Sequence, residues 1–208
     1  YAADGNGCIY KSMRIDGILD DMKQKGIKWV FIGAVDNALL NMIDPILLGL
    51  TVCDGNKIGS KSVVKISPEE PVGVFCKKNG KPGVIEYTEL PTEMAHEVDE
   101  EGELLFGESH IMCNLYSIDA LDKISKEKLP YHSAHKKAPF LNEKGEFIKV
   151  TKPNAYKYEA FIFDGFAYFD NISILRGRRN EDFAPVKNAE GPDSPATAIE
   201  LYNNYWKV

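Results

Sequence analysis

The chain has 208 residues, of which 44% are hydrophobic and 27% are charged, so it is long and apolar enough to bury a core. Its formal net charge of -6 leaves no uniform positive field for a nucleic acid or an anionic membrane surface. A membrane-spanning helix needs roughly 20 consecutive apolar residues, and Gly33, Asp36 and Gly49 interrupt the best candidate stretches. The sequence therefore predicts neither nucleic acid nor membrane as a partner.

The first third of the chain alternates helix and strand patterns. Apolar residues recur every three or four positions between Tyr10 and Gly26, which predicts one amphipathic helix with Gly26 as its stop. Residues 29–35 are apolar without alternation, which is typical of a strand buried on both faces in a parallel sheet. A short helix is expected at residues 45–50 and a strand at residues 62–66. This order predicts an α/β fold with a doubly wound sheet.

Two hairpins are expected in the middle of the chain. Residues 72–87 contain two strand patterns around Asn79 and Gly80, a dipeptide that supplies the positive φ angles of a tight turn. A second hairpin is predicted at residues 140–150, and the acidic residues 97–103 are expected to form a solvated connection.

The last part of the chain is expected to contain two helices and a strand. Aromatic residues recur at helical spacing in residues 158–169, and residues 172–175 have a strand pattern. Ser194 is expected to cap a final helix that begins at Pro195 and buries four side chains, which are Ala198, Leu201, Tyr202 and Tyr205. Since no repeat and no Pro/Ser-rich linker divides the chain, one domain portion is predicted for residues 1–208.

The thiols and the first residues bear on the cellular compartment. The four cysteines, Cys8, Cys53, Cys76 and Cys113, lie far apart without a C-x-x-C pair, which is typical of reduced, buried thiols. The chain starts at Tyr1 without a basic segment leading into an apolar one, so no signal peptide is recognised and an upstream segment is expected. These features together favour a cytoplasmic protein.

Two short segments have the composition of a phosphate or nucleotide site. Asp36 follows the most hydrophobic predicted strand, and ligands of open α/β sheets bind beyond such carboxyl ends. Its carboxylate suits Mg²⁺ that bridges phosphates, or it caps the following turn. Gly5 and Gly7 precede the first predicted helix, where backbone amides approach a ligand closely, or they form a plain turn.

Other candidate groups are less specific. Lys157 and Lys187 lie in predicted loops and either neutralise phosphates or are merely solvated. His132 and His135 would share one side of a helix, but no neighbouring carboxylate or cysteine completes a metal site. The chain has no P-loop, no dinucleotide-binding fingerprint and no nucleophile elbow, so covalent catalysis has no support.

Seven segments nevertheless occur in a specific order between residues 3 and 206. They are Asp4-Gly5-Asn6-Gly7, Val35-Asp36-Asn37, Glu69-Glu70-Pro71-Val72-Gly73-Val74, Val84-Ile85-Glu86-Tyr87, Lys152-Pro153-Asn154, Lys157-Tyr158-Glu159-Ala160-Phe161-Ile162-Phe163-Asp164 and Phe183-Ala184-Pro185-Val186-Lys187-Asn188-Ala189. In this order the chain resembles the eukaryotic-type UDP-N-acetylglucosamine pyrophosphorylases, within the wider UDP-sugar pyrophosphorylase family.

This resemblance implies a Rossmann-like nucleotide-diphosphosugar transferase fold, with a mixed sheet and antiparallel hairpin insertions. The implied reaction converts UTP and N-acetylglucosamine 1-phosphate to UDP-N-acetylglucosamine and pyrophosphate, with Mg²⁺ required. The resemblance assigns Gly5 to the uracil side of the nucleotide and Asp36 to the metal and the nucleotide phosphates. It assigns the sugar to Asn6 and to a pocket of Gly73, Glu86 and Tyr87. It assigns Lys157 and Lys187 to the phosphates as catalytic groups.

Two departures from the family pattern leave alternatives open. The family's glycine-rich, phosphate-gripping loop and its C-terminal portion have no counterpart here, so residues 1–208 are expected to be a central piece of a catalytic domain. His110 stands where the family usually has a sugar-binding asparagine, so glucose 1-phosphate or another hexose 1-phosphate is an alternative substrate. A third hypothesis is a non-catalytic module that binds a UDP-sugar or a partner protein. No oligomeric state is predicted.

Overall fold

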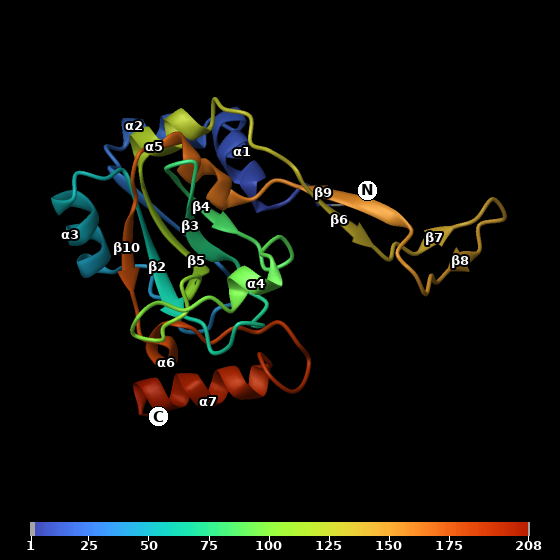
Figure 1. Cartoon of the computed structure of the whole chain (residues 1–208). Helices are drawn as coiled ribbons and strands as arrows, with labels where there is room; N and C mark the ends of the chain where they lie inside the picture. Colours follow the sequence, from blue (N-terminus) through green and yellow to red (C-terminus); the bar gives the residue numbers. More distant parts are fainter. Residues whose placement is uncertain (1–2, 208) are drawn as a thin grey trace.

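The computed structural model describes residues 3–207 and contains a six-stranded mixed sheet (Figure 1). In spatial order its strands are β10 (Ser173–Arg176), β2 (Ile58–Val64), β5 (Glu108–Ser117), β3 (Val74–Lys78) and β4 (Lys81–Ile85), and β1 (Trp29–Gly33) also pairs with β5. The β10–β2 pair is parallel, whereas the other pairs are antiparallel. The mixed sheet is confirmed, and the expectation of a doubly wound parallel sheet is wrong.

The longest strand, β5, organises the sheet and was not expected from the sequence. It pairs with β2 along one edge, and along the other edge it pairs first with β3 at Ser109 and then with β1. The change of partner falls at Met112, which has a positive φ of 50° and whose carbonyl accepts a hydrogen bond of 2.9 Å from Ala34. Because buried polar residues interrupt its apolar pattern, β5 lacks the sequence signature of a central strand.

Helices gather at both ends of the sheet (Figure 1). One end carries α1 (Ile9–Ile15), α2 (Ile18–Gln24) and α5 (Ile118–Ile124), and the other carries α6 (Arg179–Asp182) and α7 (Pro195–Trp206). The lateral helix α3 (Pro45–Cys53) packs beside β2 and β10, and the short α4 (Thr92–Ala95) lies in the connection before β5. No described helix is both long and apolar enough to cross a membrane.

The expectations for individual helices are confirmed in part. The helix expected between Tyr10 and Gly26 is two helices, because Gly17 between them adopts a left-handed conformation with φ 71°. Ile15, which was expected on the buried face, is exposed. Gly26 does end the second helix, also with φ 71°. Ser194 caps α7 as expected, but Tyr202 and Tyr205 are exposed rather than buried. The helix ends could therefore be predicted from local capping residues, whereas the buried face of α7 could not.

The hairpins match expectation and one predicted helix does not. Asn79 and Gly80 have φ angles of 52° and 77° in the turn between β3 and β4. The second hairpin, β7 (Phe140–Leu141) and β8 (Phe147–Ile148), forms the tip of an arm whose base is β6 (His132–Lys136) and β9 (Ala155–Glu159) (Figure 1). Residues 158–169, expected as a helix, start in β9 and continue into the 3-10 helix η2 (Ile162–Tyr168).

The thiols match expectation only in part. All four cysteines are free, as expected, but Cys53 is exposed and only Cys113 is fully buried. A second 3-10 helix, η1 (Asn6–Cys8), leads into α1.

A buried pair of tyrosines ties the helices to the sheet. The hydroxyl of Tyr10 on α1 lies 2.8 Å from the hydroxyl of Tyr116 on β5 and 2.7 Å from the carbonyl oxygen of Ile162. The two rings meet edge to face at 5.8 Å between centroids. Burial raises the pKa of both tyrosines, so both hydroxyls stay protonated. This contact holds α1, β5 and η2 against one another.

We predict that Tyr10→Phe destabilises the protein by about 1–3 kcal/mol, because it leaves the Ile162 carbonyl oxygen or the Tyr116 hydroxyl buried without its partner. Urea unfolding of the wild type and the variant measures the difference. The control is Tyr131→Phe, since that tyrosine is exposed and bonds to Asp4 at the surface. Equal stability of all three proteins would contradict this role of the tyrosine pair.

Candidate functional site

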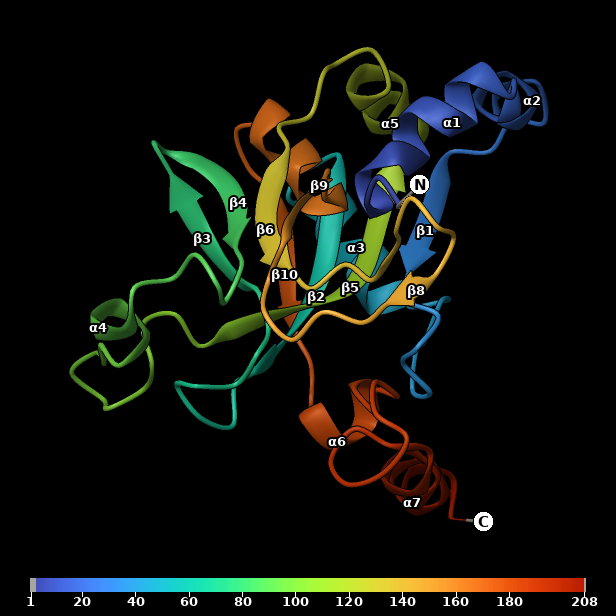
Figure 2. The same cartoon turned by 90° about the vertical axis from the view of Figure 1, so that its right-hand side faces the viewer.

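One of the predicted site residues, Asp36, lies at one end of the sheet. Because β1 and β2 are both antiparallel to β5, and β10 is parallel to β2, these three strands end on the same side. That side is where α6 and α7 lie (Figure 2). Asp36 follows β1 there, which is the position expected for a ligand-binding carboxylate.

Asp36 and Lys187 are brought together by two paired backbone segments. The carbonyl of Asp36 accepts a hydrogen bond of 2.8 Å from the amide of Val186, and the amide of Ala38 donates to the carbonyl of Ala184 at 3.0 Å. A half-buried carboxylate and a lysine from distant parts of the chain therefore stand on adjoining segments.

Asn37 fixes this pairing from inside. Its side chain is buried, and Nδ2 donates to the carbonyl of Asp182 at 2.8 Å. Its Oδ1 accepts from the amides of Ala184, at 2.8 Å, and Leu39, at 3.2 Å. No role was expected for Asn37 beyond its place in the motif, because two of its partners, Asp182 and Ala184, lie 145 and 147 residues further along the chain.

Asp36 is suited to a phosphate-bound Mg²⁺. No described group of three or more His, Cys, Asp or Glu side chains has the arrangement of a metal site. Mg²⁺ takes one or two carboxylates and completes its shell with phosphates and water. One half-buried carboxylate at the carboxyl end of a strand, on a segment paired with the segment of Lys187, fits that mode and not a cage built from protein ligands alone.

Gly73, Glu86 and His110 form a second group. The amide of His110 donates to the carbonyl of Gly73 at 2.8 Å. A Cβ at Gly73 would lie 2.8 Å from a methyl of Val84 and 3.1 Å from Oε1 of Glu86. Any larger residue at position 73 would therefore crowd Val84 and the Glu86 carboxylate. Burial, and then the nearby Glu89, raise the pKa of Glu86, while the charges of His132 and Lys187 oppose this.

Lys187 is thus close enough for its charge to lower the pKa of Glu86, although burial of Glu86 has the larger and opposite effect. Tyr87, the next residue, is exposed.

His110 is a neutral ring in an aromatic enclosure. Phe75, Phe163 and Phe166 surround it edge to face, with centroids 5.2, 5.7 and 5.8 Å away. Burial lowers its pKa to about 4. Its Nε2 lies 3.2 Å from Oδ1 of Asn114, so Nε2 carries the proton and Nδ1 is left as an acceptor.

A cluster of His132, Glu89 and Asp164 was not predicted from the sequence. Nδ1 of His132 lies 2.7 Å from Oε1 of Glu89, and Nε2 lies 3.0 Å from Oδ2 of Asp164. The ring also packs on Phe161, with 4.9 Å between centroids. Burial opposes the imidazolium, but the two carboxylates outweigh it and raise the pKa of His132.

His132 is therefore a clamp between three segments that are far apart in the sequence. Its expected position on a helix beside His135 is wrong, since both histidines lie on β6 and His135 stacks on Tyr156 instead.

Gly5 and Asn6 form the third part of the site. Gly5 has φ 89°, and a Cβ there would lie 2.2 Å from the carbonyl oxygen of Ala160, so the turn requires glycine. Oδ1 of Asn6 accepts from the amide of Ile162 at 2.8 Å, and Nδ2 lies 3.2 Å from Sδ of Met112. The Asn6 amide is thus held between η2 and the bend of β5.

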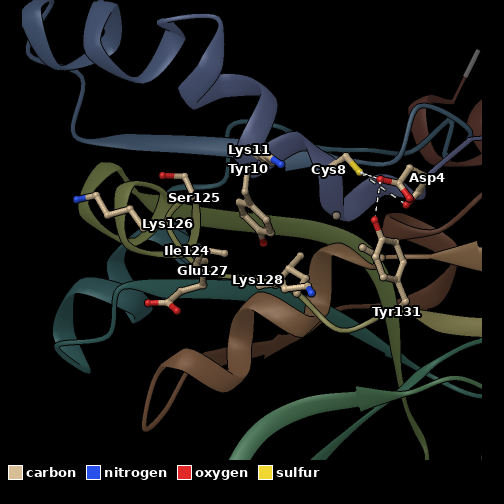
Figure 3. Close-up of a pocket in the computed structure, with 13 residues that line it drawn as sticks. Asp4, Cys8, Tyr10, Lys11, Ile124, Ser125, Lys126, Glu127, Lys128 and Tyr131 are labelled. Carbon is tan, nitrogen blue, oxygen red and sulfur yellow. Dashed lines mark hydrogen bonds between the residues drawn. The ribbon is translucent and has the colours of Figure 1, made fainter.

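A cavity of about 420 Å³ lies beside this turn (Figure 3). Asp4 and Gly7 line it, whereas Gly5 and Asn6 do not. Oδ2 of Asp4 accepts hydrogen bonds from Cys8 at 3.0 Å and from Tyr131 at 3.1 Å (Figure 3). The bond to Asp4 raises the pKa of Cys8, which keeps the thiol protonated.

Lys157 stands apart from the other predicted residues. It lies on β9 opposite Ala134, and its Nζ forms an ion pair of 2.8 Å with Oε1 of Glu159. Among the described residues no hydrogen bond or ion pair joins it to Asp36 or Lys187. Its role toward phosphates stays a prediction.

Residues 1–194 match the family described as UTP–glucose-1-phosphate uridylyltransferase. The UDP-N-acetylhexosamine pyrophosphorylase-like protein 1 of Homo sapiens is 40% identical over 202 residues, covering 95% of this chain and 40% of that protein. The UDP-N-acetylglucosamine pyrophosphorylase of Saccharomyces cerevisiae is 36% identical over 207 residues, covering 96% of this chain and 43% of that protein. The chain thus spans about two fifths of the length of these curated relatives.

Solved structures show the same similarity. A putative UDP-N-acetylglucosamine pyrophosphorylase from Entamoeba histolytica superposes with a TM-score of 0.87 at 36% identity, covering 98% of this chain and 51% of that one. An inhibitor-bound UDP-N-acetylglucosamine pyrophosphorylase from Trypanosoma brucei gives 0.76 at 34% identity, covering 88% and 36%. These likenesses confirm the fold expected for nucleotide-diphosphosugar transferases.

We predict that His132→Gln destabilises the protein by about 1–2 kcal/mol at about pH 6, where the imidazolium bonds to both carboxylates. A group whose pKa is raised on folding stabilises fully below its unfolded pKa, and the stabilisation fades as pH rises through the folded pKa. The difference from wild type should therefore shrink at about pH 9.

Urea unfolding at the two pH values measures this difference, with His135→Gln on the exposed side of the same strand as the control. A His132 effect that grows with pH would contradict the clamp.

Proposed function

The chain belongs to the UTP–glucose-1-phosphate uridylyltransferase family, and we propose that the intact protein converts UTP and N-acetylglucosamine 1-phosphate to UDP-N-acetylglucosamine and pyrophosphate. The observation that supports this most is the backbone pairing of the Asp36 segment, at the carboxyl end of β1, with the segment that carries Lys187, whose charge also acts on Glu86. A phosphate group and a sugar would then meet at one point. Two relatives named as a probable UDP-N-acetylglucosamine pyrophosphorylase and as a UDP-N-acetylglucosamine pyrophosphorylase, at 40% and 36% identity, support the same proposal.

The proposed reaction is a direct nucleotidyl transfer. An oxygen of the sugar phosphate attacks the α-phosphorus of UTP, a new O–P bond forms, and the bond to the β-phosphate oxygen breaks to release pyrophosphate. No protein nucleophile is needed, because rate enhancement comes from alignment of the two substrates and from neutralisation of phosphate charge. Lys187 is the group we assign to that neutralisation, and Lys157 is a further candidate.

Asp36 is the residue we propose to hold Mg²⁺ together with the nucleotide phosphates. When bound, the ion would supply positive charge to the phosphate oxygens. The described residues contribute the rest by position: Asn37 fixes the loop of Asp36, and the paired segment fixes Lys187. The turn at Gly5 is assigned to the uracil side of the nucleotide.

The sugar is proposed to lie against Gly73, Glu86 and Tyr87, with Asn6 and His110 at its borders. The Glu86 carboxylate accepts hydrogen bonds from sugar hydroxyls, and the free Nδ1 of His110 also accepts only. An acceptor-only group bonds to a sugar hydroxyl or to the acetamido N–H, but not to the acetamido carbonyl oxygen. Because a hydroxyl satisfies His110 as well as the acetamido group does, glucose 1-phosphate stays a second candidate substrate.

We predict that Asp36→Asn and Lys187→Ala each lower turnover of the intact protein by more than about tenfold without unfolding it. Loss of either charge removes neutralisation where phosphate charge develops. Pyrophosphate release from UTP and N-acetylglucosamine 1-phosphate in Mg²⁺ measures the rate. Matched controls are Asp16→Asn and Lys152→Ala, which change exposed residues elsewhere.

Unchanged rates in both site variants would remove the assignment of the phosphate site. Binding of a UDP-sugar by a wild-type protein that releases no pyrophosphate would favour a non-catalytic binding module.

His110→Asn is expected to shift the ratio of kcat/KM toward the N-acetylated sugar by about tenfold, because an amide both donates and accepts from one edge. The measurement is the ratio for N-acetylglucosamine 1-phosphate against glucose 1-phosphate. His96→Asn, which changes an exposed histidine outside the proposed sugar pocket, is the control. An unaltered ratio would show that His110 does not contact the sugar.

A further inference from the structure

A buried lysine that no assigned role uses lies beneath the phosphate side of the site. Lys61 is on β2, and its side chain is 6% exposed. Its Nζ lies 2.6 Å from Oδ2 of Asp44 and 2.6 Å from Oδ1 of Asp182. Burial works against its charge, but the two carboxylates outweigh burial and raise its pKa, so Lys61 is an ammonium ion.

Each carboxylate of this triad is itself anchored. Oδ1 of Asp44 caps α3 by accepting from the amides of Ile46 and Leu47, at 2.9 and 3.1 Å. Oδ2 of Asp182 accepts from the amide of Arg178 at 3.1 Å. Gly177 leaves room for this carboxylate, since a Cβ there would lie 2.3 Å from Oδ2.

The triad continues into the loop of Asp36. The carbonyl of Asp182 accepts from Nδ2 of Asn37, and Oδ1 of Asn37 accepts from the amide of Ala184. The carbonyl of Asp36 accepts from the amide of Val186, next to Lys187. A series of hydrogen bonds and peptide links therefore runs from the Lys61 ammonium to the backbone of Asp36 and of Val186, the residue before Lys187.

We propose that Lys61 is a positioning residue, which fixes Asp182 and through it the separation of Asp36 and Lys187. A buried ion pair adds little net stability, because desolvation offsets the attraction, but removing one partner leaves an uncompensated charge. Two carboxylates share this one cation, so its loss would make them repel each other and displace Asp182. The catalytic meaning of the link rests on the proposed function, whereas the link itself does not.

The test uses Lys61→Met, Lys61→Arg and the control Lys65→Met in the intact protein. Lys65 is also buried at the end of β2, but its Nζ donates to the carbonyl of Pro68 and bonds to neither carboxylate of the triad. The first readout is amide hydrogen exchange at Ala184 and Val186, with Tyr116 in the core of β5 as internal reference.

We expect exchange at Ala184 and Val186 to accelerate by about tenfold or more in Lys61→Met, with Tyr116 unchanged. Lys61→Arg should restore most of the protection, since it keeps the charge, and Lys65→Met should leave both amides as in wild type. If Lys61→Met fails to fold, Gly177→Ala displaces Asp182 by contact with the new methyl group and should give the same local acceleration.

The second readout is the Mg²⁺ concentration that gives half-maximal turnover, which should rise by about fivefold or more in Lys61→Met. In an Asp36→Asn background the same change should cost less than about twofold in rate, because residues that act through one another are not additive.

Unchanged exchange at Ala184 and Val186 in Lys61→Met and Gly177→Ala overturns the inference, whatever the activity. Accelerated exchange with unchanged Mg²⁺ dependence reduces Lys61 to a structural residue and also overturns it. If exchange accelerates in Lys61→Met but the wild-type protein shows no turnover, the proposed function is overturned and the structural link stands.

Discussion

The pairing between the segment after β1 and the segment after α6 is the constraint on which the site depends. Two backbone hydrogen bonds and the buried Asn37 amide hold residues 36–38 against residues 184–186. Neither segment belongs to a sheet or a helix, so no regular element would bring them together without these bonds. Their contact brings the segment that carries Asp36 beside the segment that carries Lys187.

Local chemistry explains which parts of the fold could be predicted from the sequence. Asn79 and Gly80 define a turn, and Ser194 defines a helix start, because each acts on backbone within a few residues. The strand β5 could not be predicted, since the buried polar residues Ser109 and Asn114 interrupt its apolar pattern. β9 was not predicted, with Lys157 expected in a loop and residues 158–159 in a helix, because its pairing with β6 depends on residues about twenty positions away.

The same distinction applies to the site. The resemblance supplied Asp36, Lys187, Gly73 and Glu86 as separate positions, and the structure gives each pair its physical reason to be adjacent. Sequence alone could not show the His132 clamp or the Lys61 triad, because each joins three segments that are distant along the chain. Each cluster ties three chain segments to one another, which is how supporting contacts make a site built mostly of loops rigid.

The central claim is that these residues belong to an enzyme that makes and breaks a bond at the α-phosphorus of a uridine nucleotide. Pyrophosphate exchange tests it most directly: the intact protein is incubated with UDP-N-acetylglucosamine, labelled pyrophosphate and Mg²⁺. The account predicts that label appears in the β- and γ-phosphates of newly formed UTP. Retention of all label in pyrophosphate, under conditions where the protein binds the UDP-sugar, would contradict it.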